Sequence, residues 1–375
     1  MQKHFDFVIL GAGIAGLSAA YFLSKSARVA VVEREQAWGY HSSGRSAAVF
    51  IEAYENPTVS DLSFDAKGFL HQPPDGFSEY PLIKPLGGLM VVRDGEQAAA
   101  EAYLHDWSLR CPRLERVDAQ EALARVPILR REGLQGAILD PNLMSIDTNQ
   151  LMQSYLRGFR ANHGELFCGF DCSVESTPAQ QWRMRCDDQT LTTPILVNAS
   201  GAWANQTAEH AGVQILPIAP RRRTAVLLSM PSGAPSWPMV RTMDQTLYFK
   251  PEDPGVMISP QDEGESSACD AQAEELDIAV AIDRFQTLCD FNISRVHSHW
   301  AGLRSLTPDR CPVVGFAEDA TNFFWLAGQG GAGIQTSPAL GKLAAECLLS
   351  GSNLDLRLDP SRFLHQEHAD AHQAK

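Results

Sequence analysis

An α/β fold is predicted by three features of this 375-residue sequence. Residues 5–10 form an apolar, strand-like run that leads into a glycine-rich segment, residues 11–16, and then into an apolar helix. A similar unit lies near the end of the chain, where the strand-like residues 322–327 enter the glycine-rich residues 328–333 before another helix. Between these units, residues 195–203 form a buried strand that breaks at small residues, typical of a strand returning to the first sheet.

The first glycine-rich segment indicates a dinucleotide cradle. Gly11 suits a tight turn with positive φ, Gly13 lets a pyrophosphate approach the backbone, and Gly16 lets the helix pack on the strand. The helix begins near Ile14 and Ala15, where free amides and the positive end of the helix dipole would hold the phosphates.

Glu33 ends the next strand-like run, residues 28–33, at about the spacing where a carboxylate accepts hydrogen bonds from an adenosine ribose. A 2′-phosphate would be repelled there, which argues against NADP.

The second glycine-rich segment favours FAD over NAD, because it suggests one elongated cofactor contacted by both ends of the chain. Its helix start would place amide donors at the pyrimidine edge of an isoalloxazine, where negative charge develops on reduction. The alternative is a loop that only tightens the packing of strand on helix.

The elements between the two units follow from periodicity and capping. Residues 39–48, rich in small and hydroxyl side chains, predict a polar loop entering a helix start. Helices are predicted over residues 98–124, interrupted at Cys111 and Pro112 and with Asp118 as an N-cap, and over residues 146–162. The remaining predictions are strands over residues 165–174 and 181–186, hairpin strands over 219–228 and 246–259, and a solvated acidic loop over 261–275.

Composition excludes several classes of partner. The formal net charge of −14 disfavours nucleic acid and anionic membranes, which need a basic face. No apolar run reaches the roughly 18 to 20 residues that span a bilayer, and the chain enters its first strand without room for a signal peptide, so we expect a cytoplasmic protein. Eight cysteines without a CxxC pair and eleven histidines without HExxH predict no metal site.

Several further stretches resemble the D-amino-acid oxidase superfamily of FAD-dependent oxidoreductases. They are residues 44–47, 198–203, 300–305 and 328–341, and the resemblance spans nearly the full chain. Within the superfamily the chain most resembles bacterial D-arginine dehydrogenases, broad-specificity D-amino-acid dehydrogenases, through residues 39–42, 140–141 with 146–148, 221–223, 248–251 and 333–337.

This resemblance implies two domains. The first is a Rossmann-like FAD-binding domain built from discontinuous segments, residues 1–55, 146–212 and 300–375. The second is a substrate domain with a mostly antiparallel sheet, residues 56–145 and 213–299. The substrate would bind between them.

The resemblance also implies non-covalent FAD and a defined set of cofactor contacts. These are Gly11, Gly13, Ile14, Ala15, Gly16, Glu33, Arg34, Ser43, Gly44, Arg45, Ser46, Ala47, Val174, Ala199, Gly201, Trp203, Arg304, Gly330, Gly331, Ala332, Gly333, Ile334, Gln335 and Thr336.

For the substrate, the resemblance places Arg222 and Arg304 on the carboxylate, since a guanidinium clamps a carboxylate bidentately. Tyr54 and Tyr248 would be hydroxyl donors, and the backbone of Gly331 and the side chain of Gln335 would face the flavin and the substrate amine. The alternatives are a structural ion pair for each arginine and a stacked core ring for each tyrosine.

The implied reaction oxidises a D-amino acid by hydride transfer from Cα to flavin N5, giving an imino acid that hydrolyses to a 2-oxo acid and ammonia. No general base is evident, and solvent could deprotonate the amine. The electron acceptor, oxygen, a quinone or another, stays open. The alternatives are a sarcosine or glycine oxidase-like amine oxidation, a 2-hydroxy-acid oxidation, and a non-catalytic flavin-binding protein.

The sequence departs from D-arginine dehydrogenases where an acidic side chain would meet the substrate guanidinium. Gly87 and Gly88 stand before the Met90 strand, and Val49 to Glu52 replace a histidine and a threonine. We therefore expect a more apolar pocket with a weaker preference for D-Arg and D-Lys, which Glu52 could partly offset.

Overall fold

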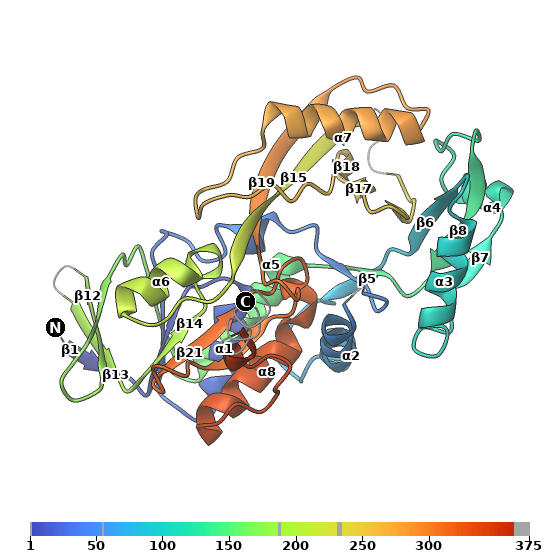
Figure 1. Cartoon of the computed structure of the whole chain (residues 1–375). Helices are drawn as coiled ribbons and strands as arrows, with labels where there is room; N and C mark the ends of the chain where they lie inside the picture. Colours follow the sequence, from blue (N-terminus) through green and yellow to red (C-terminus); the bar gives the residue numbers. More distant parts are fainter. Residues whose placement is uncertain (1, 55, 187–188, 231–234, 364–375) are drawn as a thin grey trace, which may run out of the picture.

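The fold is that of a computed structural model, which describes residues 2–54, 56–186, 189–230 and 235–363 (Figure 1). A six-stranded sheet carries both glycine-rich units, with the order β10-β3-β2-β14-β21-β20. Its neighbouring strands are parallel except β20 and β21, and β14 lies between β2 and β21, so the predicted returning strand is confirmed. The strands are β2 (Phe7–Leu10), β3 (Val29–Glu33), β10 (Glu165–Cys168), β14 (Ile195–Asn198), β20 (Val313–Phe316) and β21 (Phe323–Ala327).

One face of this sheet is covered by helices that share its largest apolar core. They are α1 (Ile14–Leu23), α2 (Pro57–His71), α5 (Thr148–Ala161) and α8 (Gly333–Ser350). Asp147 caps α5 by accepting a hydrogen bond from the Gln150 amide, and the Asn56 side chain caps α2 by accepting one from the Val59 amide. The other face packs with α6 (Ala204–Ala211) and a four-stranded sheet formed by β1 (Gln2–His4), β13 (Gln189–Thr193), β12 (Trp182–Cys186) and β11 (Ser173–Ser176).

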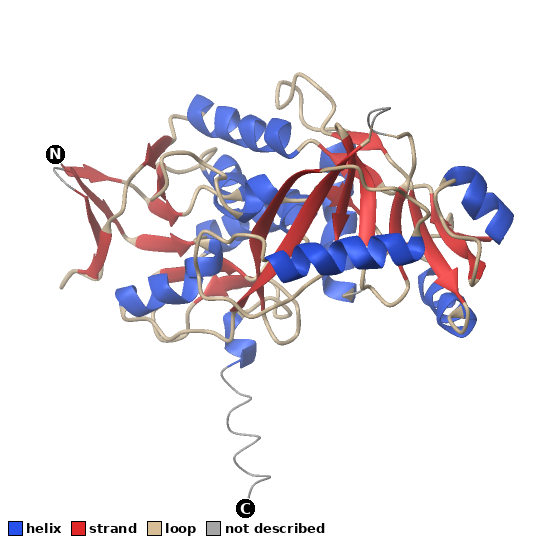
Figure 2. Ribbon diagram, turned by 90° about the horizontal axis from the view of Figure 1, so that it is seen from above, coloured by secondary structure: helices blue, strands red, loops and turns tan. Residues whose placement is uncertain are grey.

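The second large sheet has eight strands in the order β19-β15-β18-β17-β16-β6-β8-β7 and is antiparallel except where β16 meets β6. Figure 1 shows α7 (Glu275–Leu288) along the side of this sheet that faces away from the first sheet, and Figure 2 shows the helix crossing the strands from above. The strands are β6 (Gly88–Arg93), β7 (Glu115–Val117), β8 (Leu134–Asp140), β15 (Ala219–Ser229), β16 (Met239–Thr242), β17 (Tyr248–Glu252), β18 (Gly255–Ser259) and β19 (Val296–Leu306).

Smaller elements complete the fold. The helical stretch predicted over residues 98–124 is α3 (Gln97–Trp107) and α4 (Ala119–Arg125), separated by β7, and the predicted cap Asp118 accepts a hydrogen bond from the Glu121 amide. A three-stranded sheet contains β4 (Val49–Phe50), β9 (Met144–Ile146) and β5 (Ile83–Pro85), and 3-10 turns occupy η1 (Ser42–Arg45), η2 (Gly201–Trp203) and η3 (Pro360–Phe363).

The predicted α/β class, with a Rossmann-like sheet and a mostly antiparallel sheet, is confirmed. The domain boundaries stay a prediction; β19 runs across the proposed boundary at residue 300, and α2 packs in the first core although it was assigned to the substrate domain. No helix among the described residues is both long and apolar enough to cross a membrane. The described part of the chain also holds no group of three or more His, Cys, Asp or Glu side chains that could bind a metal ion.

Candidate active site

Two adjoining cavities form a trench beside the start of α1. The larger, of about 650 Å³, lies against the end of β3, and the smaller, of about 140 Å³, reaches the second sheet and the start of α8. Both are lined by Gly13, Ser42, Ser43, Ala199 and Gly201, so these residues mark the narrow part of one continuous trench.

The larger cavity has the features that the adenosine half of a dinucleotide needs. Gly11 has a φ of +105°, and a Cβ there would lie 2.4 Å from the Ala199 carbonyl oxygen. Glu33 is fixed at the cavity wall, because its carboxylate accepts hydrogen bonds from the Ala12 amide at 2.8 Å and the Glu35 amide at 3.0 Å. The start of α1 faces the narrow part, where the Ser43 hydroxyl accepts a hydrogen bond from the Ile14 amide at 2.9 Å.

The residues of the trench fit FAD. A carboxylate suited to a ribose stands in the larger cavity, and the helix starts of α1 and α8 face the narrow part and the smaller cavity, where a pyrophosphate and the electron-accepting edge of a flavin need positive potential. Neither cysteine nor histidine is among the described residues that line the smaller cavity.

Most of the residues predicted to bind cofactor or substrate line this trench. They are Gly11, Gly13, Ile14, Ala15, Glu33, Arg34, Ser43, Arg45, Ser46, Ala47, Val174, Ala199, Gly201, Trp203, Tyr248, Arg304, Gly330, Gly331, Gly333 and Ile334. The trench lining does not include Gly16, Gly44, Tyr54, Arg222, Ala332, Gln335 and Thr336.

Four of these residues outside the lining shape the backbone around the trench. A Cβ on Gly16 would lie 1.9 Å from the Gly11 carbonyl oxygen, and one on Gly44 would lie 2.5 Å from the Gly39 carbonyl oxygen, so both glycines permit close packing. Ala332 is buried at the start of α8, and the Thr336 hydroxyl donates to its carbonyl oxygen at 2.8 Å. The prediction that Thr336 contacts the cofactor is therefore wrong for its side chain.

Gln335 does not face the cavity either, and its predicted contact with the substrate amine is wrong. Its side chain is only 3% exposed and is held within the protein. The Gln335 oxygen accepts from the Ile51 amide at 3.0 Å, and its nitrogen donates to the Ser63 hydroxyl at 2.7 Å and the Ile51 carbonyl at 3.3 Å. Gln335 thus fixes the segment that leads to Tyr54.

Arg222 points away from the trench, so its predicted contact with the substrate carboxylate is wrong. Side chains alternate along β15, and Arg222 lies on the face covered by α7, where it pairs with Asp277 at 3.2 Å and Glu274 at 2.5 Å. The neighbouring Arg223 lies on the opposite face and lines the smaller cavity. The structural ion pair, which was the alternative for Arg222, is what the structure shows.

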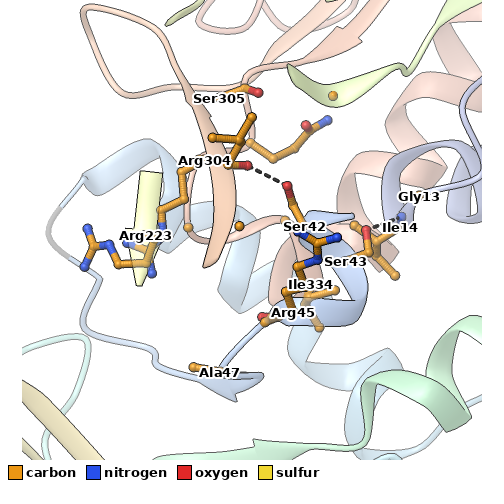
Figure 3. A pocket seen from close by; sticks show the side chains of 18 of the residues that line it. Gly13, Ile14, Ser42, Ser43, Arg45, Ala47, Arg223, Arg304, Ser305 and Ile334 are labelled. Atoms are coloured by element: carbon orange, nitrogen blue, oxygen red, sulfur yellow. Dashed lines mark hydrogen bonds between the residues drawn. The ribbon is translucent and has the colours of Figure 1, made fainter. Parts of the chain in front are cut away.

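Arg304 and Arg223 come together at the smaller cavity. They lie on the same face of paired strands, because Arg304 is opposite Arg221, two residues from Arg223. Figure 3 shows both arginines on one side of this cavity and Gly13 and Ile14 on the other. Burial, with repulsion from Arg304, lowers the pKa of Arg223 to about 10.

The Arg304 guanidinium makes no hydrogen bond or ion pair with any side chain in the described ranges. It lies beside the backbone of Gly331: a Cβ there would be 2.8 Å from Arg304 Cζ and 3.1 Å from the Tyr54 hydroxyl. Tyr248, which is 6% exposed, lines the same cavity. The structure therefore brings together Arg304, Tyr54, Tyr248 and Gly331 as predicted, with Arg223 in the position expected for Arg222.

The acidic segment, residues 261–274, is a largely solvated loop, as the sequence predicts for residues 261–275, but several of its carboxylates form ion pairs. Its carboxylates pair with arginines on both sides of the trench. Glu263 binds Arg223 and Arg310, and Asp270 binds Arg45 at 2.5 Å and accepts from the Tyr40 hydroxyl at 3.2 Å. The remaining pairs are Glu265 with Arg221 and Glu274 with Arg222.

Sequence reasoning missed Arg223, Ser42 and the ion pairs of the acidic segment. Ser42 donates to the Leu303 carbonyl at 2.6 Å and so ties the loop after β3 to β19. Arg223 lies on the same face of β15 as Ala225, which also lines the smaller cavity, but apolar residues on both faces of this strand leave no local signal for that face.

Glu52 does not supply the missing acidic group. It is 4% exposed, pairs with Lys67 at 2.6 Å and accepts from the Asn142 amide at 3.2 Å, and it is absent from the described trench lining.

Comparisons with known proteins agree with this geometry. The family model described as FAD dependent oxidoreductase matches residues 6–347. The chain is 27% identical to FAD-dependent oxidoreductase domain-containing protein 1 of Bos taurus, over 98% of this chain and 86% of that protein.

Two solved structures share the fold. L-proline dehydrogenase from P. horikoshii superimposes with a TM-score of 0.83 at 20% identity, covering 98% of this chain and 99% of that one. Glycine oxidase from Geobacillus kaustophilus does so with a TM-score of 0.82 at 19% identity, covering 96% and 99%. These two structures show the fold, and the family model over residues 6–347 supports the superfamily predicted from the sequence. The narrower resemblance to D-arginine dehydrogenase is not carried by these comparisons.

Proposed function

The chain belongs to the FAD-dependent oxidoreductase family, and from that premise we propose that it oxidises amino acids at the Cα–N bond, with D-amino acids as the first substrate class. The observation that carries this proposal is the Arg304 guanidinium beside the smaller cavity, which has no hydrogen-bond or ion-pair partner in the part of the chain that the structure describes. A partly buried charge without a counter-ion is costly unless a ligand supplies one. Every amino acid brings a carboxylate that can do so.

The substrate carboxylate would lie between the two arginines. Arg304 presents its full fork of donors, and Arg223 has a buried Nε–H without a hydrogen-bond partner. The hydroxyls of Tyr54 and Tyr248 would add donors to the same carboxylate.

FAD, bound non-covalently, would supply the oxidising power by accepting two electrons from the substrate. The chain contributes positive potential where charge develops, because the cavity meets the start of α8 at Gly333 and Ile334. None of the described residues that line the smaller cavity is an Asp, Glu, His or Lys. We therefore propose that the protein orients the substrate and that solvent deprotonates its amine.

The side-chain pocket supports the expected weak preference for D-Arg and D-Lys. A Cβ on Gly88 would lie 2.8 Å from Leu143 Cδ1, so Leu143 would have to move to admit the acidic side chain that D-arginine dehydrogenases place nearby. The carboxylate of Glu52 is already bound by Lys67. Small and apolar D-amino acids are therefore the preferred substrates in this proposal.

The test is anaerobic bleaching of the bound flavin by a panel of D- and L-amino acids, N-methyl amino acids and 2-hydroxy acids. We expect D-alanine, D-valine and similar substrates to reduce the flavin with higher kcat/KM than D-arginine. The proposal is wrong if no amino acid reduces the flavin, or if D-arginine is the best substrate by far. Faster reduction by N-methyl amino acids would assign a sarcosine or glycine oxidase-like reaction, and reduction only by hydroxy acids would assign an alcohol oxidation. Admission of oxygen afterwards separates an oxidase from a dehydrogenase.

A further inference from the structure

Glu263 holds the arginine of the proposed carboxylate clamp. It extends from the acidic segment to the cavity face of β15, where its Oε1 accepts from Arg223 Nη2 at 3.0 Å. The acidic segment is fixed there by its neighbours: Asp262 accepts from the Thr224 amide at 2.7 Å, and the Gly264 carbonyl accepts from the Arg222 amide at 2.9 Å.

The same carboxylate also binds Arg310, which follows β19. Arg310 donates to Oε1 at 3.2 Å and to Oε2 at 2.5 Å, the fork geometry typical of an arginine with a carboxylate ligand. Burial opposes ionisation of Glu263, but its hydrogen bond from Arg310 and the charges of Arg310, Arg223 and Arg304 outweigh burial and lower its pKa.

Glu263 is not among the described residues that line the smaller cavity, but it binds the Arg223 donor that a second substrate carboxylate would need. Arg304 is available to the first carboxylate, whereas Arg223 Nη2 and the Arg310 fork already have a carboxylate from the protein itself. A ligand with one carboxylate completes the charge balance at Arg304. A second carboxylate beside Arg223 would find the Nη2 donor already bonded to Glu263.

We propose that Glu263 is a specificity-determining residue that restricts the site to substrates with a single carboxylate, because it engages the Arg223 donor that a second carboxylate would need. This inference rests on the proposed amino-acid oxidation and names the substrate class within it: monocarboxylic amino acids, in preference to acidic amino acids and N-carboxymethyl amines.

The test uses unreactive carboxylates, so that binding is measured without turnover. Butyrate and succinate have the same number of carbons but one and two carboxylates, as do valerate and glutarate. Each is titrated into the FAD-loaded protein, and binding is followed by the change in flavin absorption. For the wild type we expect the monocarboxylate of each pair to bind more tightly.

The variant Glu263→Ala removes the carboxylate that binds Arg223, and with it both its charge and its volume. We expect the affinity for succinate relative to butyrate to rise by about tenfold or more, because a charge-assisted hydrogen bond to a freed guanidinium is worth roughly that factor. Glu263→Gln removes the charge alone and keeps the packing. It should raise the ratio by less, and it serves if the alanine variant folds poorly.

The matched control is Glu265→Ala, in the same segment, whose side chain is 82% exposed and pairs with Arg221 outside the trench lining. Its succinate-to-butyrate ratio should equal that of the wild type. The inference is overturned if the wild type prefers the dicarboxylates, if neither Glu263 variant raises the ratio, or if Glu265→Ala raises it equally. Failure of butyrate to bind the wild type would overturn the proposed function together with the inference on Glu263. The outcomes named before it would overturn the inference alone.

Discussion

Replacement of Arg304 by methionine is expected to lower the affinity for carboxylate ligands without lowering the stability of the fold. The guanidinium makes no side-chain hydrogen bond or ion pair in the part of the chain that the structure describes, so folding loses no partner when it is removed. Its charge also repels the buried Arg223 and contributes, after burial, to the lowered pKa of that residue. Its charge also attracts Glu263 and helps to lower the pKa of that carboxyl, so the two effects oppose each other and the Arg304→Met variant should unfold at about the same temperature as the wild type.

Its affinity for a carboxylate should fall steeply. A hydrogen bond to a charged group contributes about 1.5–3 kcal/mol, and a bidentate contact contains two. Taking about 3 kcal/mol for the pair predicts a roughly 150-fold higher Kd for butyrate. The assay is titration of the FAD-loaded variant, followed by flavin absorption, together with thermal unfolding of the same sample.

Arg222→Met is the matched control on the opposite face of β15. It removes ion pairs with Asp277 and with Glu274, whose side chain is 58% exposed and counts for little. We expect a loss of about 1 kcal/mol of stability with butyrate affinity unchanged. The reasoning is refuted if Arg304→Met binds butyrate as the wild type does, or if Arg222→Met is the variant that loses affinity.

Three further substitutions test the surroundings of this site. Gly331→Ala places a Cβ 2.8 Å from Arg304 Cζ, so butyrate should bind at least tenfold more weakly while FAD content, measured by absorption, is unchanged; equal butyrate affinity would contradict the geometry. Gln335→Leu leaves the Ile51 amide and carbonyl without their partner, at a cost of about 1–3 kcal/mol each. The unfolding temperature should therefore fall and KM should rise. An unchanged KM would show that Gln335 does not position the Tyr54 segment. Asp270→Asn weakens the ion pair between the acidic segment and Arg45, so FAD should dissociate faster, as followed by flavin fluorescence. The control variant Glu265→Gln should leave the dissociation rate unchanged. Equal rates in the two variants would refute a role for Asp270 in holding FAD. The hydrogen bond from Arg45 holds the pKa of Asp270 below its ordinary value, so in the wild type this link should persist at mildly acidic pH and weaken only as the pH falls through that lowered pKa.

The cofactor trench could be predicted from the sequence because its signals are local. Glycines at fixed spacing after a strand, a carboxylate at the end of the next strand and an N-cap such as Asp147 each act within a few residues of where they stand. The returning strand β14 could be placed as well, because only a strand buried on both faces has so continuous an apolar run.

The face of Arg222 could not be predicted by the same means. Alternation identifies the inward face of a strand only when the other face is polar, and β15 is buried on both: Val226 and Leu228 pack in one core, Ala225 and Leu227 in another. With apolar residues at both parities, three consecutive arginines give no sign of which one meets a cavity.

The pairing of charges was also beyond local reasoning, and it decides which arginine can bind substrate. The acidic segment is distant in sequence from the arginines it contacts, which include Arg45 and Arg310. The residues around the acidic side chains do not indicate which arginines they bind, and the residues around the arginines do not indicate the acidic segment. Within the described residues, these carboxylates form ion pairs with Arg45, Arg221, Arg222, Arg223 and Arg310 and leave the Arg304 guanidinium without one. A protein with a net charge of −14 can thus offer an anionic substrate a cation at the cavity, because local pairing and not overall charge sets the potential there.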